Sequence, residues 1–289
     1  MTQIALESTV IAHGLPKPKN LEVALELEEL ARSKGCIPKT VGIVEGVPKV
    51  GLTKDEIVAI ATKDDVLKVG TAEISLAIAR KLWAATTVSA TMHLAKKAGV
   101  DVFATGGIGG VHGGEWDVSQ DITELSRTRM IVVSAGAKSI LDLKQTLEML
   151  ETFQVTVVGY RTDEFPAFYS RRSGLKIISI DTIEEVVEVY KTKEHLDLPG
   201  AVLVCNPIPE ESEIPLDTFN EWKEAALKKA ELEGISGKAL TPYILSEIAR
   251  ISGGKTVEAN VALLKNNVEL ACEIALMLQG GGYERTTDN

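Results

Sequence analysis

The sequence predicts an α/β protein: a single αβα-layered domain in which helices cover both faces of a largely parallel sheet. Two observations predict it. Short apolar segments alternate with longer amphipathic ones along the chain, and no fixed-period repeat or Pro/Ser-rich linker divides it. A chain of 289 residues is long enough to bury a large core. We therefore expect one domain over residues 1–289, with residues 280–289 as a frayed polar tail.

The expected elements follow one another in alternating order. Apolar segments rich in β-branched residues predict strands at 40–46, 100–104, 130–134, 155–160 and 200–206. Helical spacing of apolar residues predicts helices at 21–34, 53–61, 74–83, 90–99, 139–153, 184–196, 216–233, 239–250 and 257–279. Gly35 is suited to end the first helix, and Thr53 with Glu56 matches a capping box at the start of the second.

Composition excludes several classes of protein. A net charge of −10 argues against nonspecific binding to nucleic acid or membrane surfaces, although it does not exclude a local basic pocket. No window approaches the roughly 18 uninterrupted apolar residues of a membrane span, and the first residues lack the pattern of a secretion signal. The 3 cysteines lack paired spacing, which disfavours a disulfide framework. We expect a cytoplasmic protein that acts on a small molecule.

The densest chemical signal is the glycine-rich segment 105–114, TGGIGGVHGG, which directly follows a predicted strand. Glycines let backbone N–H groups approach an anion closely, which suits a phosphate. His112 replaces the third glycine of a dinucleotide-binding motif, and no P-loop lysine follows. The segment is either a phosphate-binding loop or a flexible connection, and its glycine content favours the functional alternative.

Two carboxylates follow this segment closely, Asp117 and Asp121 in WDVSQD. Carboxylates beside a glycine-rich loop can hold Mg²⁺ or Mn²⁺, hard ions that keep several waters and need few protein ligands. A zinc site is less expected, because the 4 histidines are scattered along the chain. Either aspartate could instead cap a helix, a role that suits Asp121 in particular.

Lys138 is the most informative single residue. It follows a strand rich in β-branched residues, at the expected entry to a helix that Ser139 or a neighbour would cap. This places its amine at the carboxyl edge of a parallel sheet, where α/β active sites lie. A helix N-terminus and partial burial both disfavour an ammonium ion, which would leave a free amine able to attack a carbonyl. A surface lysine is the commoner alternative.

Five further polar residues are weaker candidates. Glu7 could serve as a general acid if burial raised its pKa, although a solvent-facing strand residue is the commoner outcome. His13 is a second acid–base candidate, and Lys68 could bind phosphate as a point charge. Asn206 and Asn260 stand in apolar stretches and need hydrogen-bond partners, from protein or ligand, if they are buried.

Longer motifs in these regions resemble one known family. ESTVIAHGLP, TTVSATM, FATGGIGGVH, D-x-S-x-D, AGAKSILD with LETF, NPIPEE and NVALLKNN occur in order over nearly the whole chain. Together they are similar to the pseudouridine-5′-phosphate glycosidases, also called the indigoidine synthase A-like family. A set of motifs this long is far more specific than an isolated glycine-rich loop.

The resemblance implies an activity and an assembly. Family members reversibly cleave the C–C glycosidic bond of pseudouridine 5′-phosphate to uracil and ribose 5-phosphate, with a divalent metal that is usually Mn²⁺. The match implies Lys138 as a nucleophile that forms a Schiff-base adduct at C1′, Glu7 as the proton donor to the ring oxygen, and Asp117 as the metal ligand. We expect the substrate contacts to be Lys68, Val88, Ser119, Gln120, Asp121 and Asn260. A homotrimer is also implied.

Two alternatives remain open. The nearest is an enzyme of the same scaffold that acts on another C-nucleotide or mainly forms the bond. A noncatalytic phosphosugar- or nucleotide-binding protein of this fold is the second. The joint presence of Glu7, Asp117 and Lys138 favours an enzyme, because a binding protein has no use for a lysine nucleophile.

Overall fold

A ten-stranded sheet forms the centre of the computed structural model, which describes residues 1–113, 117–235 and 240–280. The strand order is β4-β5-β2-β1-β6-β7-β10-β8-β9, with β3 paired to β2. Only the pairings of β2 with β3 and with β5 are antiparallel, so the expected largely parallel sheet is confirmed. The strands are β1 (Gln3–Leu6), β2 (Ile37–Val44), β3 (Val47–Val50), β4 (Leu67–Val69), β5 (Ala84–Thr86), β6 (Val102–Ala104), β7 (Ile131–Ser134), β8 (Thr156–Tyr160), β9 (Ile178–Ile180) and β10 (Val202–Cys205).

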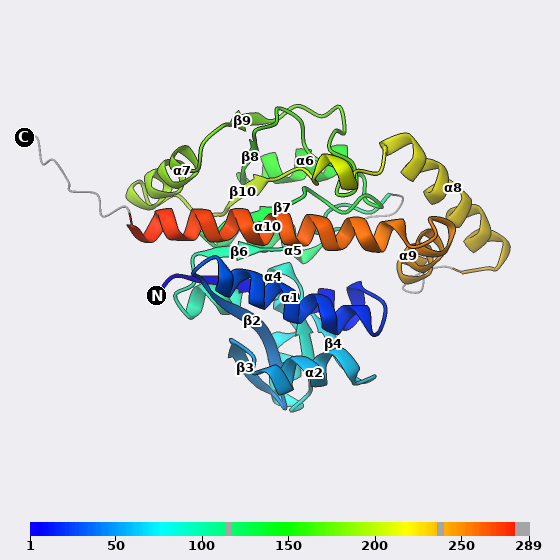
Figure 1. Cartoon of the computed structure of the whole chain (residues 1–289), viewed down its shortest axis with the longest axis horizontal. Coiled ribbons are helices and arrows are strands. Elements are labelled where there is room, and N and C mark those ends of the chain that lie inside the picture. The colour runs from blue at the N-terminus through cyan, green and yellow to red at the C-terminus, as the bar shows by residue number, and fades with distance from the viewer. Residues whose placement is uncertain (114–116, 236–239, 281–289) are drawn as a thin grey trace, which may run out of the picture.

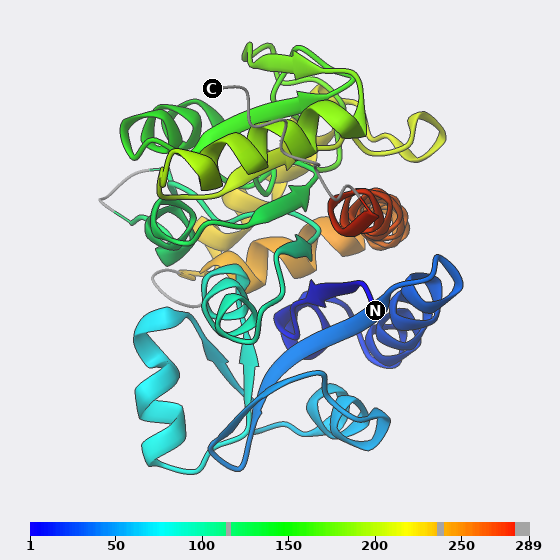
Figure 2. The same cartoon turned by 90° about the vertical axis from the view of Figure 1, so that its left-hand side faces the viewer.

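Helices cover both faces of this sheet. In Figure 2 the blue α1 and the red α10 lie on one side of the sheet, and the cyan-to-green helices α4, α5 and α6 lie on the other. The helices are α1 (Lys19–Ser33), α2 (Lys54–Thr62), α3 (Ile74–Ala79), α4 (Val88–Lys97), α5 (Gln120–Arg127), α6 (Leu143–Thr152), α7 (Ile183–His195), α8 (Leu216–Leu232), α9 (Leu240–Ile251) and α10 (Lys255–Gly280). Three short turns complete the set: η1 (Val10–Gly14), η2 (Thr71–Glu73) and η3 (Glu210–Ser212).

The alternation of side chains along the central strands creates two apolar cores. On β7, Ile131 and Val133 point into one core and Val132 into the other, as expected for a strand buried on both faces. The first core is closed by α1, α7 and α10, and the second by α4, α5 and α6. Figure 1 shows α10 running the length of the molecule between α1 and α7. The three-layer αβα architecture is therefore confirmed.

Some expected boundaries were wrong. The helix predicted at 74–83 ends at Ala79, because the chain turns at Lys81 (φ 52°) to enter β5. The helix predicted to begin at Ser139 begins at Leu143, where the Asp142 side chain accepts a hydrogen bond from the Gln145 N–H. Strands β1, β3, β4, β5 and β9, each of three or four residues, were not among the predicted strands.

The C-terminal end of the chain differs from the expectation at one residue. Gly280, expected in the polar tail, is the last residue of α10, and the rest of that tail (281–289) lies outside the described residues. In the part of the chain that the structure describes, no helix has both the length and the apolar character needed to cross a bilayer.

Candidate active site

A cavity of about 760 Å³ opens at the carboxyl ends of the central strands. Glu7 follows β1, the glycine-rich segment follows β6, and Lys138 lies four residues after the end of β7, so three neighbouring strands deliver their next residues to one edge. This is the position at which parallel α/β sheets bind ligands. Of the residues singled out in the sequence, the cavity is lined by Glu7, His13, Lys68, His112, Ser119, Gln120, Asp121, Lys138 and Asn260.

Glu7 is a buried carboxyl group, not a solvent-facing strand residue. Its side chain is 8% exposed, and one of its oxygens, Oε1, accepts a hydrogen bond from the Thr105 hydroxyl. Burial raises the pKa of Glu7, and the nearby positive charge of Lys138 and the Thr105 hydrogen bond oppose that rise. The net increase favours a protonated carboxyl group, which is what a general acid requires.

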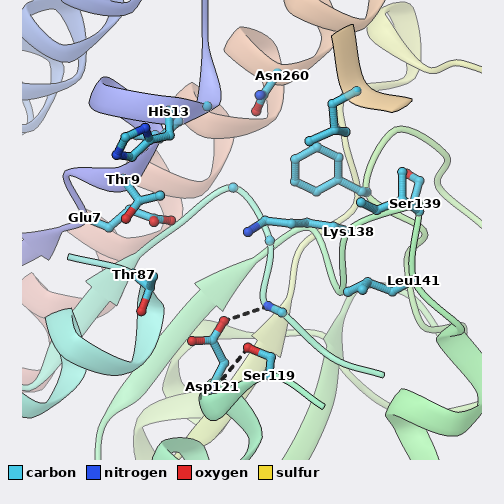
Figure 3. A pocket seen from close by; sticks show the side chains of 18 of the residues that line it. Glu7, Thr9, His13, Thr87, Ser119, Asp121, Lys138, Ser139, Leu141 and Asn260 are labelled. Atoms are coloured by element: carbon cyan, nitrogen blue, oxygen red, sulfur yellow. Dashed lines mark hydrogen bonds between the residues drawn. The ribbon is translucent and has the colours of Figure 1, made fainter. Parts of the chain in front are cut away.

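Lys138 lies on a turn rather than at a helix entry. Its backbone N–H donates to the Ile108 carbonyl at 3.2 Å, and four residues separate it from the first residue of α6. Gly136 (φ 79°) starts this turn; any side chain there would collide with the Pro166 carbonyl oxygen. Figure 3 shows the half-buried Lys138 side chain crossing the cavity with its amine toward Glu7 and Thr9.

Part of the glycine-rich segment directs its N–H groups to the protein rather than to a ligand. The N–H groups of Ile108, Gly109 and Val111 donate to protein oxygens, so they are not free for an anion. Side chains at Gly109 and Gly110 would collide with Ser119 and Thr146. Close packing against these neighbours therefore explains these two glycines.

Asp121 connects this segment to α4. One of its carboxylate oxygens accepts from the Gly109 N–H at 2.8 Å and the other from the Ser89 N–H at 2.9 Å. Asp121 is not the helix cap that the sequence allowed, because Ser119 caps α5 by accepting from the Asp121 N–H. These two hydrogen bonds hold the backbone at Gly109 and at Ser89 beside the cavity. A dashed line at Asp121 in Figure 3 marks the bond from the Gly109 N–H.

Two basic side chains stand near Glu7 and Lys138. Lys68, on β4, is exposed to the cavity, yet the surrounding walls lower its pKa by desolvation and the charge of Lys138 lowers it further. His13, in η1, has a pKa lowered by desolvation and by the charge of Lys68. A neutral imidazole is therefore favoured at His13 near pH 7.

Three residues expected in the site either bond or pack against the protein or lie outside the cavity lining. The Val88 side chain is buried in the second core, and its neighbours Thr87 and Ser89 line the cavity instead. Gln120 lines the cavity but also donates to Glu73 and accepts from the Ala72 N–H at 2.8 Å. Asp117 is exposed and is not among the residues that line the cavity.

The described residues contain no group of three His, Cys, Asp or Glu side chains that could hold a metal ion. In the sequence Asp117 directly follows residues 114–116, which lie outside the described ranges. Its carbonyl oxygen accepts from the His112 N–H at 2.9 Å. A single exposed carboxylate fits an ion held mostly by waters, as Mn²⁺ and Mg²⁺ often are, and does not fit a closed zinc site.

Two buried polar atoms within the described ranges have no hydrogen-bond partner: Thr9 Oγ1 and Asn260 Oδ1. Both residues line the cavity, and Figure 3 shows Asn260 on the opposite side of Lys138 from Asp121 and Ser119. An orphaned buried polar atom is costly unless a ligand or water satisfies it. Asn206, the other isolated asparagine, is bonded to the protein, through Asn267 Oδ1 at 3.0 Å.

Sequence patterns missed one wall of the cavity. Phe168 and Tyr169 pack edge to face, with ring centroids 4.7 Å apart, and line the cavity together with Phe219. The Phe168 ring also occupies the space that a side chain at Gly107 would need. The available signal was the DEFPAFYS segment (163–170), which concentrates aromatic residues in a chain that is only 4% aromatic.

This chain is similar to known proteins over nearly its whole length. The family model described as indigoidine synthase A like protein matches residues 2–277. Two curated relatives, each named pseudouridine-5′-phosphate glycosidase, come from Pseudothermotoga lettingae and Kosmotoga olearia. The first is 60% identical, covering 94% of this chain and 96% of the relative, and the second is 59% identical, covering 97% and 98%.

Solved structures show the same architecture. An indigoidine synthase A-like protein from Thermotoga maritima is 44% identical with a TM-score of 0.90, covering 96% of this chain and 93% of that one. The prealnumycin C-glycosynthase AlnA, solved in complex with ribulose 5-phosphate, is 35% identical with a TM-score of 0.90, covering 96% and 92%.

Proposed function

Since this chain belongs to the indigoidine synthase A-like family, we propose that it is a pseudouridine-5′-phosphate glycosidase that releases uracil and ribose 5-phosphate. The observation that carries the proposal is the pair of Glu7, a buried acid with a raised pKa, and Lys138, an amine directed toward it within one cavity. The test is chromatography of the products after the purified protein is incubated with pseudouridine 5′-phosphate. Release of uracil supports the proposal, and an unchanged substrate contradicts it.

The chemistry of a C–C bond explains why an amine is needed. The bond has no leaving-group oxygen to protonate, so the two-carboxylate mechanism of ordinary glycosidases does not apply. We infer that Glu7 protonates the ribose ring oxygen, the bond from that oxygen to C1′ breaks, and the Lys138 amine bonds to C1′. Burial of Glu7 supports the first step, because it keeps the carboxyl proton available.

Bond cleavage then follows from the new C–N bond. The electrons of the C1′–uracil bond move to the uracil carbon, which gains the proton that the amine loses, and C1′ becomes doubly bonded to the Lys138 nitrogen as a Schiff base. Water hydrolyses that bond to give ribose 5-phosphate and free Lys138. The proton released by hydrolysis restores Glu7, so one water is consumed in each turnover.

Substrate contacts are proposed on both sides of Lys138. Lys68 supplies a positive charge to the cavity. Ser119 and Asp121 lie on one side of Lys138 in Figure 3, and Gln120, between them in the sequence, also lines the cavity. The main chain at Val88 is proposed as a further contact, because its neighbours Thr87 and Ser89 line the cavity. On the opposite side, the unpartnered Asn260 Oδ1 and Thr9 Oγ1 are suited to the polar edge of a heterocyclic base.

The Thr9 hydroxyl is expected to contribute to substrate binding. Thr9→Val keeps the shape of the side chain but removes the hydroxyl, so the KM for pseudouridine 5′-phosphate rises about 2- to 10-fold, as for one lost neutral hydrogen bond. Thr9→Ser retains the hydroxyl and serves as the control. Steady-state kinetics of the two variants measure the effect. Equal KM values in both variants would show that the hydroxyl does not contact the substrate.

We further propose that Asp117 holds a divalent ion, Mn²⁺ in the first instance, through its carboxylate and waters. When bound, such an ion offsets the negative charge of the substrate phosphate. Asp117→Ala therefore raises the Mn²⁺ concentration needed for half-maximal activity and weakens Mn²⁺ binding measured by electron paramagnetic resonance. The exposed Asp55, on α2, provides the control variant Asp55→Ala. If the Asp117 variant titrates like wild type, the ligand is Asp121 or His112.

The reverse reaction is a second candidate, favoured by one finding. A solved relative that shares 35% identity over 96% of this chain is named a C-glycosynthase. Because a catalyst accelerates both directions, incubation with uracil and ribose 5-phosphate is expected to form pseudouridine 5′-phosphate. The ratio of the two initial rates at equal substrate concentrations measures which direction the cavity favours.

A further inference from the structure

A buried chain of polar side chains connects Glu7 to the long helix α10. The Thr105 hydroxyl donates to Glu7 Oε1, and the Thr105 carbonyl oxygen accepts from Asn267 Nδ2 at 2.8 Å. Asn267 Oδ1 accepts in turn from Asn206 Nδ2 at 3.0 Å. Thr105 is 1% exposed and Asn267 0%, so this chain lies out of contact with solvent.

We propose that Asn267 is a positioning residue for the reaction. It holds Thr105 so that the threonine hydroxyl donates a hydrogen bond to one oxygen of Glu7, Oε1. The other oxygen, Oε2, then carries the proton that is given to the substrate. The inference rests on the proposed function, because Glu7 needs an oriented proton only if it acts as the acid. Asn267 itself touches no reacting atom; it acts through Thr105.

Hydrogen-bond counting supports this division of the two oxygens. A threonine hydroxyl has one proton, and in this structure that proton is directed to Glu7 Oε1. A protonated carboxyl group carries its hydrogen on one oxygen only. With Oε1 already accepting, the favoured site for the acidic proton is Oε2, so the Thr105 hydroxyl decides which oxygen of Glu7 can donate.

The Thr105 backbone is fixed from two sides. Its N–H donates to the Val133 carbonyl on β7 at 3.0 Å, and its carbonyl accepts from Asn267 on α10. Asn267 Nδ2 also lies 3.4 Å from the Gly106 carbonyl oxygen. Loss of the Asn267 amide leaves the bond to Val133 as the hydrogen bond that holds the Thr105 backbone, next to a glycine pair that adds no stiffness.

The neighbouring asparagine provides a matched control. Asn266 also lies on α10 and also donates to a backbone carbonyl, that of Pro207 at 3.0 Å, but this bond leads away from Glu7. Asparagine is a poor helix former in both positions, so replacing either by alanine improves helix propensity equally. The two variants differ in which carbonyl oxygen loses its donor. Asn267→Ala also removes the acceptor of Asn206 Nδ2 at 3.0 Å, although that amide keeps its bond to the Asn266 carbonyl oxygen at 3.3 Å.

The charges that face Glu7 are those of Lys138, Asp121 and Lys68, and none of them is altered by a change at Asn267. A hydroxyl that donates to a carboxylate stabilises its ionised form. If Thr105 is no longer held, that stabilisation weakens and the pKa of Glu7 rises further. The alkaline limb of the kcat profile, where the acid loses its proton, then moves to higher pH by up to about one unit.

The experiment compares kcat, KM and pH profiles of wild type, Asn267→Ala and Asn266→Ala with pseudouridine 5′-phosphate as substrate. In Asn267→Ala, kcat falls roughly 10- to 100-fold with KM nearly constant, as expected when a general acid is misoriented, and the alkaline limb shifts upward. Asn266→Ala keeps the wild-type profile. Thermal unfolding checks that both variants are folded.

A double-mutant cycle tests the route of the effect. If Asn267 acts through Thr105, the double variant Thr105→Val/Asn267→Ala loses no more kcat than Thr105→Val alone, since the hydroxyl is already gone. Should Asn267→Ala fail to fold, Thr105→Val against Thr105→Ser tests the same hydroxyl, with the loss and the shift expected in the valine variant only.

Several results would overturn the inference. They are an Asn267→Ala profile equal to that of Asn266→Ala, additive losses in the double variant, or a Thr105→Val variant with the profile of Thr105→Ser. In each case wild-type turnover leaves the proposed function standing. A wild-type protein that releases no uracil would overturn both the proposed function and the inference that rests on it.

Discussion

Lys138→Ala is expected to abolish turnover of pseudouridine 5′-phosphate while leaving the fold intact. Alanine has no nitrogen with which to bond C1′, so no adduct can form. The half-buried lysine lies on a turn outside helices and strands, and its loss removes little packing. The measurement is uracil release, with the unfolding temperature as the check on structure.

Two further variants sharpen this test. Lys138→Arg keeps a positive charge but cannot supply a free amine, because a guanidinium does not deprotonate in proteins, so it is as inactive as the alanine variant. Lys144→Ala removes an exposed lysine on α6 and retains wild-type activity. Substantial turnover by Lys138→Arg would mean that this position supplies charge rather than a nucleophile.

Glu7→Gln is expected to lower kcat roughly 10²- to 10⁴-fold, the range for loss of a general acid. The amide keeps the shape of the side chain and can still accept from the Thr105 hydroxyl, so binding changes less than the rate. Steady-state kinetics measure both. A loss below tenfold would mean that another group supplies the proton.

A matched carboxylate elsewhere in the chain controls for buried charge. Glu28 is 5% exposed and accepts from the Thr40 hydroxyl at 2.6 Å, as Glu7 does from Thr105, but it lies outside the cavity and also pairs with the Arg32 guanidinium at 2.6 Å. Glu28→Gln leaves kcat at the wild-type level. A comparable loss of kcat in both variants would indicate a general effect of removing a buried carboxylate.

The Glu7 pKa also predicts how stability depends on pH. The folded-state pKa of Glu7 is raised above its unfolded value, so its contribution to stability is fully present below the unfolded pKa and is lost as pH rises through the folded pKa. Glutamine does not titrate. The unfolding temperature of Glu7→Gln is therefore expected to rise relative to that of wild type as pH increases. A difference between the two unfolding temperatures that does not change with pH would contradict the raised pKa.

Patterns along the chain predicted the architecture better than the details of the site. The parallel sheet follows from the alternation of apolar and amphipathic segments, and it places Glu7 and Lys138 at the same edge. The turn at Lys138 could not be predicted, because Gly136 and the loop around Pro166 meet only in three dimensions. The helix cap is Asp142, three residues after the expected Ser139.

The glycine-rich segment shows a second reason for the limits of sequence analysis. Its composition is the same whether its N–H groups bind a ligand or the protein, and only the positions of Asp121, Ser119 and Thr146 distinguish the two. In the same way, no local pattern shows that Thr9 and Asn260 lack partners. The metal at Asp117 and the homotrimer stay predictions.

Borohydride trapping is the direct test for a covalent bond between Lys138 and the sugar. The protein is incubated with ribose 5-phosphate and borohydride, which reduces a Schiff base to a stable amine, and is then analysed as intact protein and as peptides by mass spectrometry. We expect the mass of one added sugar phosphate, located on the peptide that contains Lys138. The Lys138→Ala variant is expected to show no such addition. Ribose 5-phosphate that binds without any adduct, or an adduct on another lysine, would contradict a covalent bond to Lys138.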